Sequence, residues 1–150
     1  MLSKIVNAHG DSASAVMLWT NGTKATMRGF SDENRKLIAE GIYGDAAARK
    51  RAVALIDAYL AKPREHVSQV IPEALFHLQQ PARALEVLHT QQITDTSDPF
   101  VLLWSPQGRS MRMLPEFSAF IHDFGFIELW DKLGPPDICK KNEKGDYICE

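Results

Sequence analysis

The sequence lacks long apolar runs. Among its 150 residues the apolar stretches are short, as in Phe100–Trp104, whereas a membrane-spanning helix needs about 20 such residues. The N-terminal segment, Met1–Asn7, also lacks the apolar core of a signal peptide. We therefore expect no membrane span in this chain.

An excess of positive charge is absent as well. The chain has 17 Lys and Arg residues against 19 Asp and Glu residues, which gives a net charge of −2. Surfaces that bind nucleic acid usually carry a strong basic excess, so we expect no direct contact with nucleic acid. Apolar residues make up 45% of the chain and charged residues 24%, as in an ordinary soluble globular domain.

The common catalytic motifs are missing too. The sequence has no Gly-rich phosphate loop, and neither Ser105 nor Ser110 lies in a Gly-x-Ser-x-Gly motif. His122 and Asp123 are neighbours, but successive side chains on a helix point about 100° apart, so we do not expect an acid–base dyad there. The sequence therefore predicts no enzyme and no cofactor.

Helical periodicity is what the sequence has in abundance. Ser31 or Asp32 is a suitable N-cap, and apolar residues at helical spacing continue from there to about Tyr43. Gly44-Asp45 interrupts the pattern, and Asp45 can cap a second, alanine-rich helix. This pattern predicts a helical hairpin over residues 31–61.

A similar hairpin is predicted on either side. The first joins a helix over residues 2–8 to one over residues 12–20 through Gly10-Asp11. In the third, an apolar stripe over residues 67–78 contains Pro72. Its helix either starts near Ile71 or begins near Glu65 and is kinked. Gln79-Gln80 is the predicted turn to a partner helix that ends near residue 92.

The turns of these hairpins are evenly spaced. Gly10 and Gly44 are 34 residues apart, and Gly44 and Gln79 are 35 apart. A period of about 34 residues built from paired helices is the spacing of tetratricopeptide repeats. The alternative is three unrelated hairpins, because the third turn does not keep the Gly-Asp pair.

The pattern changes after residue 92. Three shorter helices are predicted over residues 97–104, 115–124 and 126–133, and residues 137–150 are expected to form a charged tail without regular structure. No segment has the pattern of a β-strand. The fold class is therefore all-α: one helical-repeat domain with about two and a half stacked, tetratricopeptide-like hairpins over residues 1–92, closing helices over 93–134 and a tail over 135–150.

The C-terminal third carries the most specific motifs, and they occur in a fixed order: Asp98-Pro99-Phe100, Arg112-Met113-Leu114-Pro115-Glu116-Phe117, Phe124-Gly125-Phe126-Ile127-Glu128-Leu129-Trp130, and Pro136-Asp137-Ile138-Cys139 with a last Cys149. This order resembles the end of tetratricopeptide-containing bacterial regulators, over roughly residues 31–150. Those proteins close with Arg-x-x-Pro-x-Phe-like, Gly-Leu-x-x-Tyr-Trp-like and Pro-Asp-Phe-Cys-like segments. Leu129 and Ile138 depart from that pattern but keep its apolar character.

The resemblance implies a non-catalytic interaction or regulatory module from a larger signalling or transcription regulator. Many such proteins carry a winged-helix domain and a membrane span, which would place this part outside the cytoplasm; the alternative is a cytoplasmic location. The expected partner is a protein or peptide, including the parent chain or a second copy. The alternative function is a small-molecule sensor with a pocket between the last repeat and the closing helices.

A polar row on the third hairpin is the candidate binding site. Side chains spaced three or four residues apart share one helix face, and in tetratricopeptide hairpins the first helix lines the concave groove: His66, Gln69, Glu73 and His77. The alternative is an ordinary solvated helix face. Glu73 and His77 have no third ligand at a metal-site spacing, so we expect no metal.

The closing motifs supply structural candidates. Arg112 is expected to hold a loop through a bidentate hydrogen bond rather than bind a ligand. Trp104, Phe117, Trp130 and Asp137 belong to the same closing element, in which the tryptophans are expected to pack in the core or else to form an aromatic binding patch.

The two cysteines recur together in the resembling proteins, beyond the last helix. A disulfide between Cys139 and Cys149 would pin the tail and would persist in an oxidising compartment. The alternative is two free thiols in a cytoplasmic tail.

Overall fold

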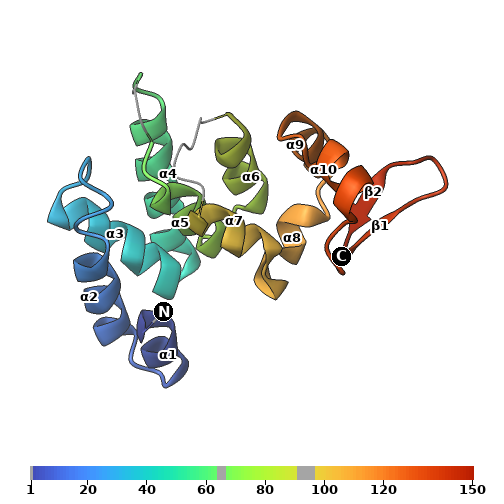
Figure 1. The fold of residues 1–150 in the computed structure, drawn as a ribbon. Coiled ribbons are helices and arrows are strands. Elements are labelled where there is room, and N and C mark those ends of the chain that lie inside the picture. Colours follow the sequence, from blue (N-terminus) through green and yellow to red (C-terminus); the bar gives the residue numbers. More distant parts are fainter. Residues whose placement is uncertain (1, 64–66, 91–96) are drawn as a thin grey trace. The chain divides into compact units, whose positions relative to one another are not determined.

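The computed structural model describes residues 2–63, 67–90 and 97–150, and most of these residues are helical. The chain divides into two compact units, residues 1–80 and 81–150, which are described separately here (Figure 1). The division falls in the predicted turn of the third hairpin, so the two helices of that hairpin belong to different units.

Within its described residues, 2–63 and 67–80, unit 1 contains five helices in the order that the sequence predicts (Figure 1, blue to green): α1 Leu2–Ala8, α2 Ser12–Gly22, α3 Asp32–Tyr43, α4 Ala46–Leu60 and α5 Val70–His77. Three of them begin at a residue whose side chain accepts a hydrogen bond from a backbone N–H three residues on. Asp11 caps α2, Ser31 caps α3 and Asp45 caps α4. These caps satisfy N–H groups that have no partner inside the helix, and they fix where each helix begins.

The helix α3 lies at the centre of unit 1 and contacts α2, α4 and α5. Its Ile38 and Ala39 are fully buried. Gly41 faces α4 and α5, where a Cβ atom would overlap Ala52 and come within 2.9 Å of Leu78 Cδ2. The helices therefore approach each other closely because this position has no side chain.

The two ends of α5 show how the third turn differs from the others. The helix begins at Val70, next to the predicted Ile71, so Pro72 lies in its first turn. Backbone N–H groups in the first turn have no partner within the helix, so the N–H that proline lacks costs no hydrogen bond there. At the other end Gln79 adopts a left-handed conformation with φ of 61°. Its N–H donates to Phe76 O, and the next N–H donates to Leu75 O, which is a Schellman ending without the usual glycine.

Unit 2 begins with a longer helix and continues in short elements: α6 Pro81–Thr90, α7 Ser97–Trp104, the 3-10 turn η1 Pro106–Gly108, α8 Arg109–Arg112, α9 Phe117–Asp123, α10 Phe126–Leu133, β1 Cys139–Lys141 and β2 Tyr147–Cys149. The helix α6 packs against α8 and α9. Gly125 separates α9 from α10 in a left-handed conformation with φ of 71°, as the predicted stop requires.

The expectation of an irregular tail without strands is wrong. β1 and β2 pair antiparallel, with Cys139 opposite Cys149 and Lys141 opposite Tyr147. The Asn142 side chain accepts hydrogen bonds from Lys144 N and Asp146 N, and Gly145 has a positive φ of 88°, so the turn is stabilised locally. Strands of three residues are too short to show an alternating pattern, which is why the sequence did not reveal them.

Among the described residues, no helix combines the length and the apolar character needed to cross a membrane.

The close approach at Gly41 gives the first prediction. Gly41→Ala should destabilise the protein by about 1–3 kcal/mol, because the added methyl group must displace α4 or Leu78. Gly22→Ala is the matched control: a Cβ atom there meets nothing within 4 Å, and alanine favours helix by up to about 1 kcal/mol. Urea unfolding of both variants measures the difference. Equal stability of the two variants would show that α3 does not depend on this contact.

Candidate functional site

The polar row predicted as a binding face is only partly described. His66 lies outside the described residues. Gln69 directly precedes α5, and Glu73 and His77 lie one turn apart on that helix. Glu73 Oε1 is 3.6 Å from His77 Nε2 and also 3.6 Å from the ammonium of Lys4 on α1. The carboxylate therefore joins α5 to α1.

Two neighbouring side chains and burial set the pKa of this carboxyl group. The interaction with His77 is the strongest influence and lowers the pKa of Glu73, Lys4 lowers it further, and burial acts in the opposite direction. Glu73 is thus charged at neutral pH, and Lys4 and His77 already interact with its carboxylate. The role of Gln69, Glu73 and His77 in binding stays a prediction.

The first helices of the predicted hairpins also contact each other elsewhere. The Tyr43 hydroxyl on α3 donates to Ser3 Oγ on α1 at 2.9 Å, and Ser3 is buried. Burial raises the pKa of Tyr43. Together with the bridge from Lys4 to Glu73, this hydrogen bond connects α1, α3 and α5 through polar side chains.

A groove of about 800 Å³ lies in unit 1 between α2, the end of α3 and the start of α4. The residues that line it are mostly small or apolar on α2 and charged along the rim: Ser12, Ala13, Val16, Met17, Thr20, Asn21, Lys36, Glu40, Tyr43, Gly44, Asp45, Ala48 and Arg51. Met17 is 58% exposed there. A large apolar side chain in an open groove is available to a binding partner.

The sequence does not predict this groove, because it does not show which apolar residues of α2 are exposed and which are buried. Trp19 and Met17 lie on the same helix, but Trp19 is buried and Met17 is exposed. Only the neighbouring helices decide which of them is covered.

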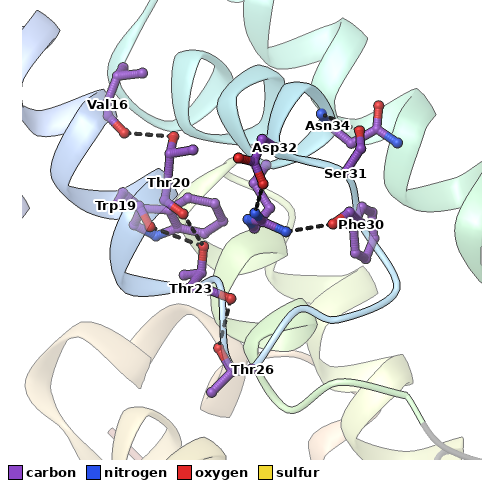
Figure 2. Close-up of polar contacts among 10 residues, drawn as sticks. Val16, Trp19, Thr20, Thr23, Thr26, Phe30, Ser31, Asp32 and Asn34 are labelled. Atoms are coloured by element: carbon purple, nitrogen blue, oxygen red, sulfur yellow. Dashed lines mark hydrogen bonds and ion pairs between the residues drawn. The ribbon is translucent and has the colours of Figure 1, made fainter.

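Hydrogen bonds stabilise both ends of the loop between α2 and α3, whose helices form walls of this groove (Figure 2). Thr20 Oγ1 donates to Val16 O and Thr23 Oγ1 to Trp19 O, at 2.8 and 3.0 Å, so these hydroxyls are used within α2. At the other end of the loop the buried Arg35 donates to Phe30 O and to the Asp32 carboxylate. Each end of the loop is therefore anchored to the helix that it adjoins.

Aromatic rings form the centre of unit 2. Trp104 makes edge-to-face contacts with Phe117 and with Trp130, at centroid distances of 6.1 and 5.7 Å. Trp130 in turn contacts Tyr147 of β2 at 5.0 Å. Edge-to-face packing of this kind is favourable for aromatic rings. Trp104, Phe117 and Trp130 thus meet in one cluster, in which Phe117 and Trp130 are buried.

Arg112 lies beside this cluster and is 4% exposed. Its Nη1 donates to Leu103 O and Ser105 O, at 2.6 and 2.8 Å, and its Nη2 donates to Glu150 O at 2.6 Å. One guanidinium group thus joins the end of α7 to the end of β2. These contacts use both terminal nitrogens of the guanidinium group, whereas its buried Nε has no hydrogen-bond partner among the described residues.

The two cysteines form a disulfide between β1 and β2, and both are buried. The hairpin that they close lies against α10, where Asp131 accepts hydrogen bonds from the Tyr147 hydroxyl and from Lys141 Nζ, both at 2.7 Å. Asp137 is exposed in the turn before β1.

His122 and Asp123 do make contact, contrary to the expectation from their positions on the helix. Asp123 Oδ1 is 3.0 Å from His122 Nδ1, and Asp123 Oδ2 is 2.8 Å from His89 Nε2 on α6. The carboxylate accepts from both rings, because His89 holds it at the end of α9. The hydrogen bond to Asp123 raises the pKa of His122, and the pKa of Asp123 is lowered by His122 first and His89 second.

No group of three or more His, Cys, Asp or Glu side chains that could hold a metal ion occurs in the part of the chain that the structure describes. Comparisons with protein-family models, with curated proteins and with solved structures found no match for this chain.

The contacts of Arg112 lead to a stability prediction. Arg112→Gln should destabilise the protein by about 2–4 kcal/mol, because it leaves buried carbonyl oxygens without a donor. Arg109→Gln is the control, since Arg109 is exposed and a surface substitution of this kind changes stability by at most about 0.5 kcal/mol. Urea unfolding under oxidising conditions measures both. If the two variants unfold at the same urea concentration, Arg112 does not hold unit 2 together.

The bridge between His89, Asp123 and His122 gives a pH prediction. His122 gains its partner in the folded state, so its contribution is present below its unfolded pKa near 6.5 and is lost as the pH rises through the raised folded pKa. We expect a proton NMR titration to place the pKa of His122 above 6.5, and Asp123→Asn to return it to that value. An unchanged His122 titration in Asp123→Asn would contradict the bridge.

Proposed function

We propose that this chain is a non-catalytic protein-interaction module and that its groove between α2, α3 and α4 receives a segment of a partner protein. The groove itself carries this proposal. It measures about 800 Å³ and presents the exposed Met17 beside small residues. Exposed apolar surface rimmed by polar residues is typical of protein-interaction sites.

The arrangement of unit 1 supports a tetratricopeptide-like stacking as part of the same proposal. The hairpins α1–α2 and α3–α4 have turns 34 residues apart, and in each turn an aspartate caps the second helix. Polar contacts connect the first helices of successive hairpins. Repeats of this kind display extended surfaces to partners. The resemblance of the closing motifs adds a role within a larger bacterial signalling or transcription regulator.

The disulfide supports an extracytoplasmic location for this part of such a regulator. Cys139 and Cys149 pair in the structure, and disulfides persist mainly in oxidising compartments.

The alternative function, small-molecule sensing, places a pocket between the last repeat and the closing helices. The pocket between α6 and Glu116, beside His89, has a volume of about 230 Å³, below the roughly 300–1,000 Å³ of most small-molecule pockets. Another pocket of unit 2, which Arg112, Phe117 and Tyr147 help to line, has a volume of about 420 Å³. The proposal of an interaction module therefore rests on the exposed Met17 and not on pocket volume.

A photocrosslinking amino acid at position 17 tests this proposal. In the organism that encodes the chain, we expect it to capture a protein that the same label at Val101 does not capture, since Val101 is 66% exposed but lies outside the groove. The captured protein is then identified and purified, and its affinity measured by calorimetry. Met17→Asp should weaken binding by at least about tenfold, as for an apolar residue at the centre of an interface.

Val101→Asp is the matched control and should bind as the unchanged protein does. Equal binding by Met17→Asp and Val101→Asp would overturn the proposal, provided that circular dichroism shows both variants folded.

A further inference from the structure

The hydroxyl groups that line the groove already donate hydrogen bonds within unit 1. Ser12 Oγ donates to the Asn7 side chain at 2.9 Å, Thr20 Oγ1 donates to Val16 O, and Tyr43 donates to Ser3. Each hydroxyl has one hydrogen to donate, so none of these three has a further donor to offer to a partner. A partner segment that needs many hydrogen bonds from the groove would find few.

The charged residues of the rim are paired in the same way, with one exception. Lys36 Nζ lies 3.8 Å from Glu40 Oε1. The Asp45 carboxylate accepts from Ala48 N at 2.8 Å and lies at the positive end of α4. Arg51 is exposed and has no hydrogen-bond or ion-pair partner within residues 2–63, 67–90 and 97–150. The groove thus offers one cation without a counter-charge.

The backbone of the walls restricts the conformation of an occupant. Apart from Gly44 and Asp45, all the lining residues belong to helices, so none of them belongs to the edge of a sheet. An extended segment would therefore bring backbone groups that find no sheet edge to pair with, and leaving such groups unpaired is costly. A helix satisfies its own backbone and needs only side-chain contacts.

The dimensions of the groove agree with a short helix. The α2 wall runs from Ser12 to Asn21, nine residue steps of helix, or about 13.5 Å. Ala13, Gly44 and Ala48 line the groove and are small, so a helix of the partner could approach this surface closely.

We infer that the groove binds an amphipathic α-helix of about two to three turns from a partner protein, whose apolar face covers Met17 and whose carboxylate pairs with Arg51. This inference rests on the proposed function and adds the chemistry of the partner. Helix-in-groove recognition is read through apolar residues spaced three or four apart, so the partner segment should show that spacing together with an acidic residue.

A displayed peptide library tests this inference with the full chain as bait. The library contains 15-residue peptides, half with a helix-forming background and half with prolines that prevent helix formation. We expect the protein to enrich helical peptides with an acidic residue at one fixed position. Arg51→Glu should instead enrich Lys or Arg at that position, whereas Lys50→Glu, the same charge change on the neighbouring exposed residue, should enrich the original peptides.

The enriched acidic peptide gives the quantitative measurement. Arg51→Glu should weaken its binding by about fivefold, which is the scale of an exposed ion pair turned into a repulsion. Replacing the peptide carboxylate by Lys should restore binding to Arg51→Glu, and added salt should reduce both effects.

The possible failures are distinct. Enriched peptides that lose affinity in Met17→Asp but show no acidic preference, or that are the proline-containing ones, overturn the partner chemistry and leave the interaction module standing. Peptides that bind Met17→Asp undiminished overturn both. Self-association of the protein alone in sedimentation experiments, abolished by Met17→Asp, would assign the groove to a second copy and overturn the inference.

Discussion

The close contact of α3 with α4 and α5 at Gly41 is the constraint on which unit 1 depends. Helices of 7 to 15 residues are marginally stable in isolation, so each must bury an apolar face against a neighbour. The helix α3 provides that neighbour for three others, and it does so because Gly41 and Ala52 leave room for the backbones to approach. Further along α3 and α4, Gly44 and Ala48 line the groove beside α2. The close packing of α3 on α4 and the groove therefore occur along the same pair of helices.

Unit 2 reaches stability by other means. Its elements after α6 contain at most eight residues each, and short elements bury little apolar area. Aromatic rings supply much of that area, and Arg112 joins the carbonyl oxygens of Leu103 and Ser105 to a third one that lies far away in the sequence. The third of these, Glu150 O, belongs to the residue that follows Cys149. The disulfide is consequently more than a cross-link within the hairpin, because it limits the positions of the oxygen that Arg112 binds.

The features that the sequence predicted are those encoded locally. Ser31 and Asp45 act as caps, and Gly125 ends a helix, because each depends on residues within one turn of itself. The features that it missed depend on distant partners. β2 is three residues long and is held by Cys139 and by Trp130. His122 meets Asp123 because His89 from α6 holds the carboxylate. The groove was missed for the same reason, since the exposure of Met17 is decided by α3 and α4.

The predicted binding face and the groove differ in what a partner would have to displace. On the predicted face, Glu73 is opposed by Lys4 and His77, so a ligand for any one of them competes with a contact that joins α1 to α5. In the groove, the hydroxyls and the rim charges other than Arg51 are paired within unit 1, and the surface that remains is apolar. The proposed partner helix would cover that surface without breaking an existing contact, and burial of apolar area provides about 25 cal/mol for each Å² removed from water. The proposed binding in the groove would therefore disturb fewer contacts than binding at Glu73 would.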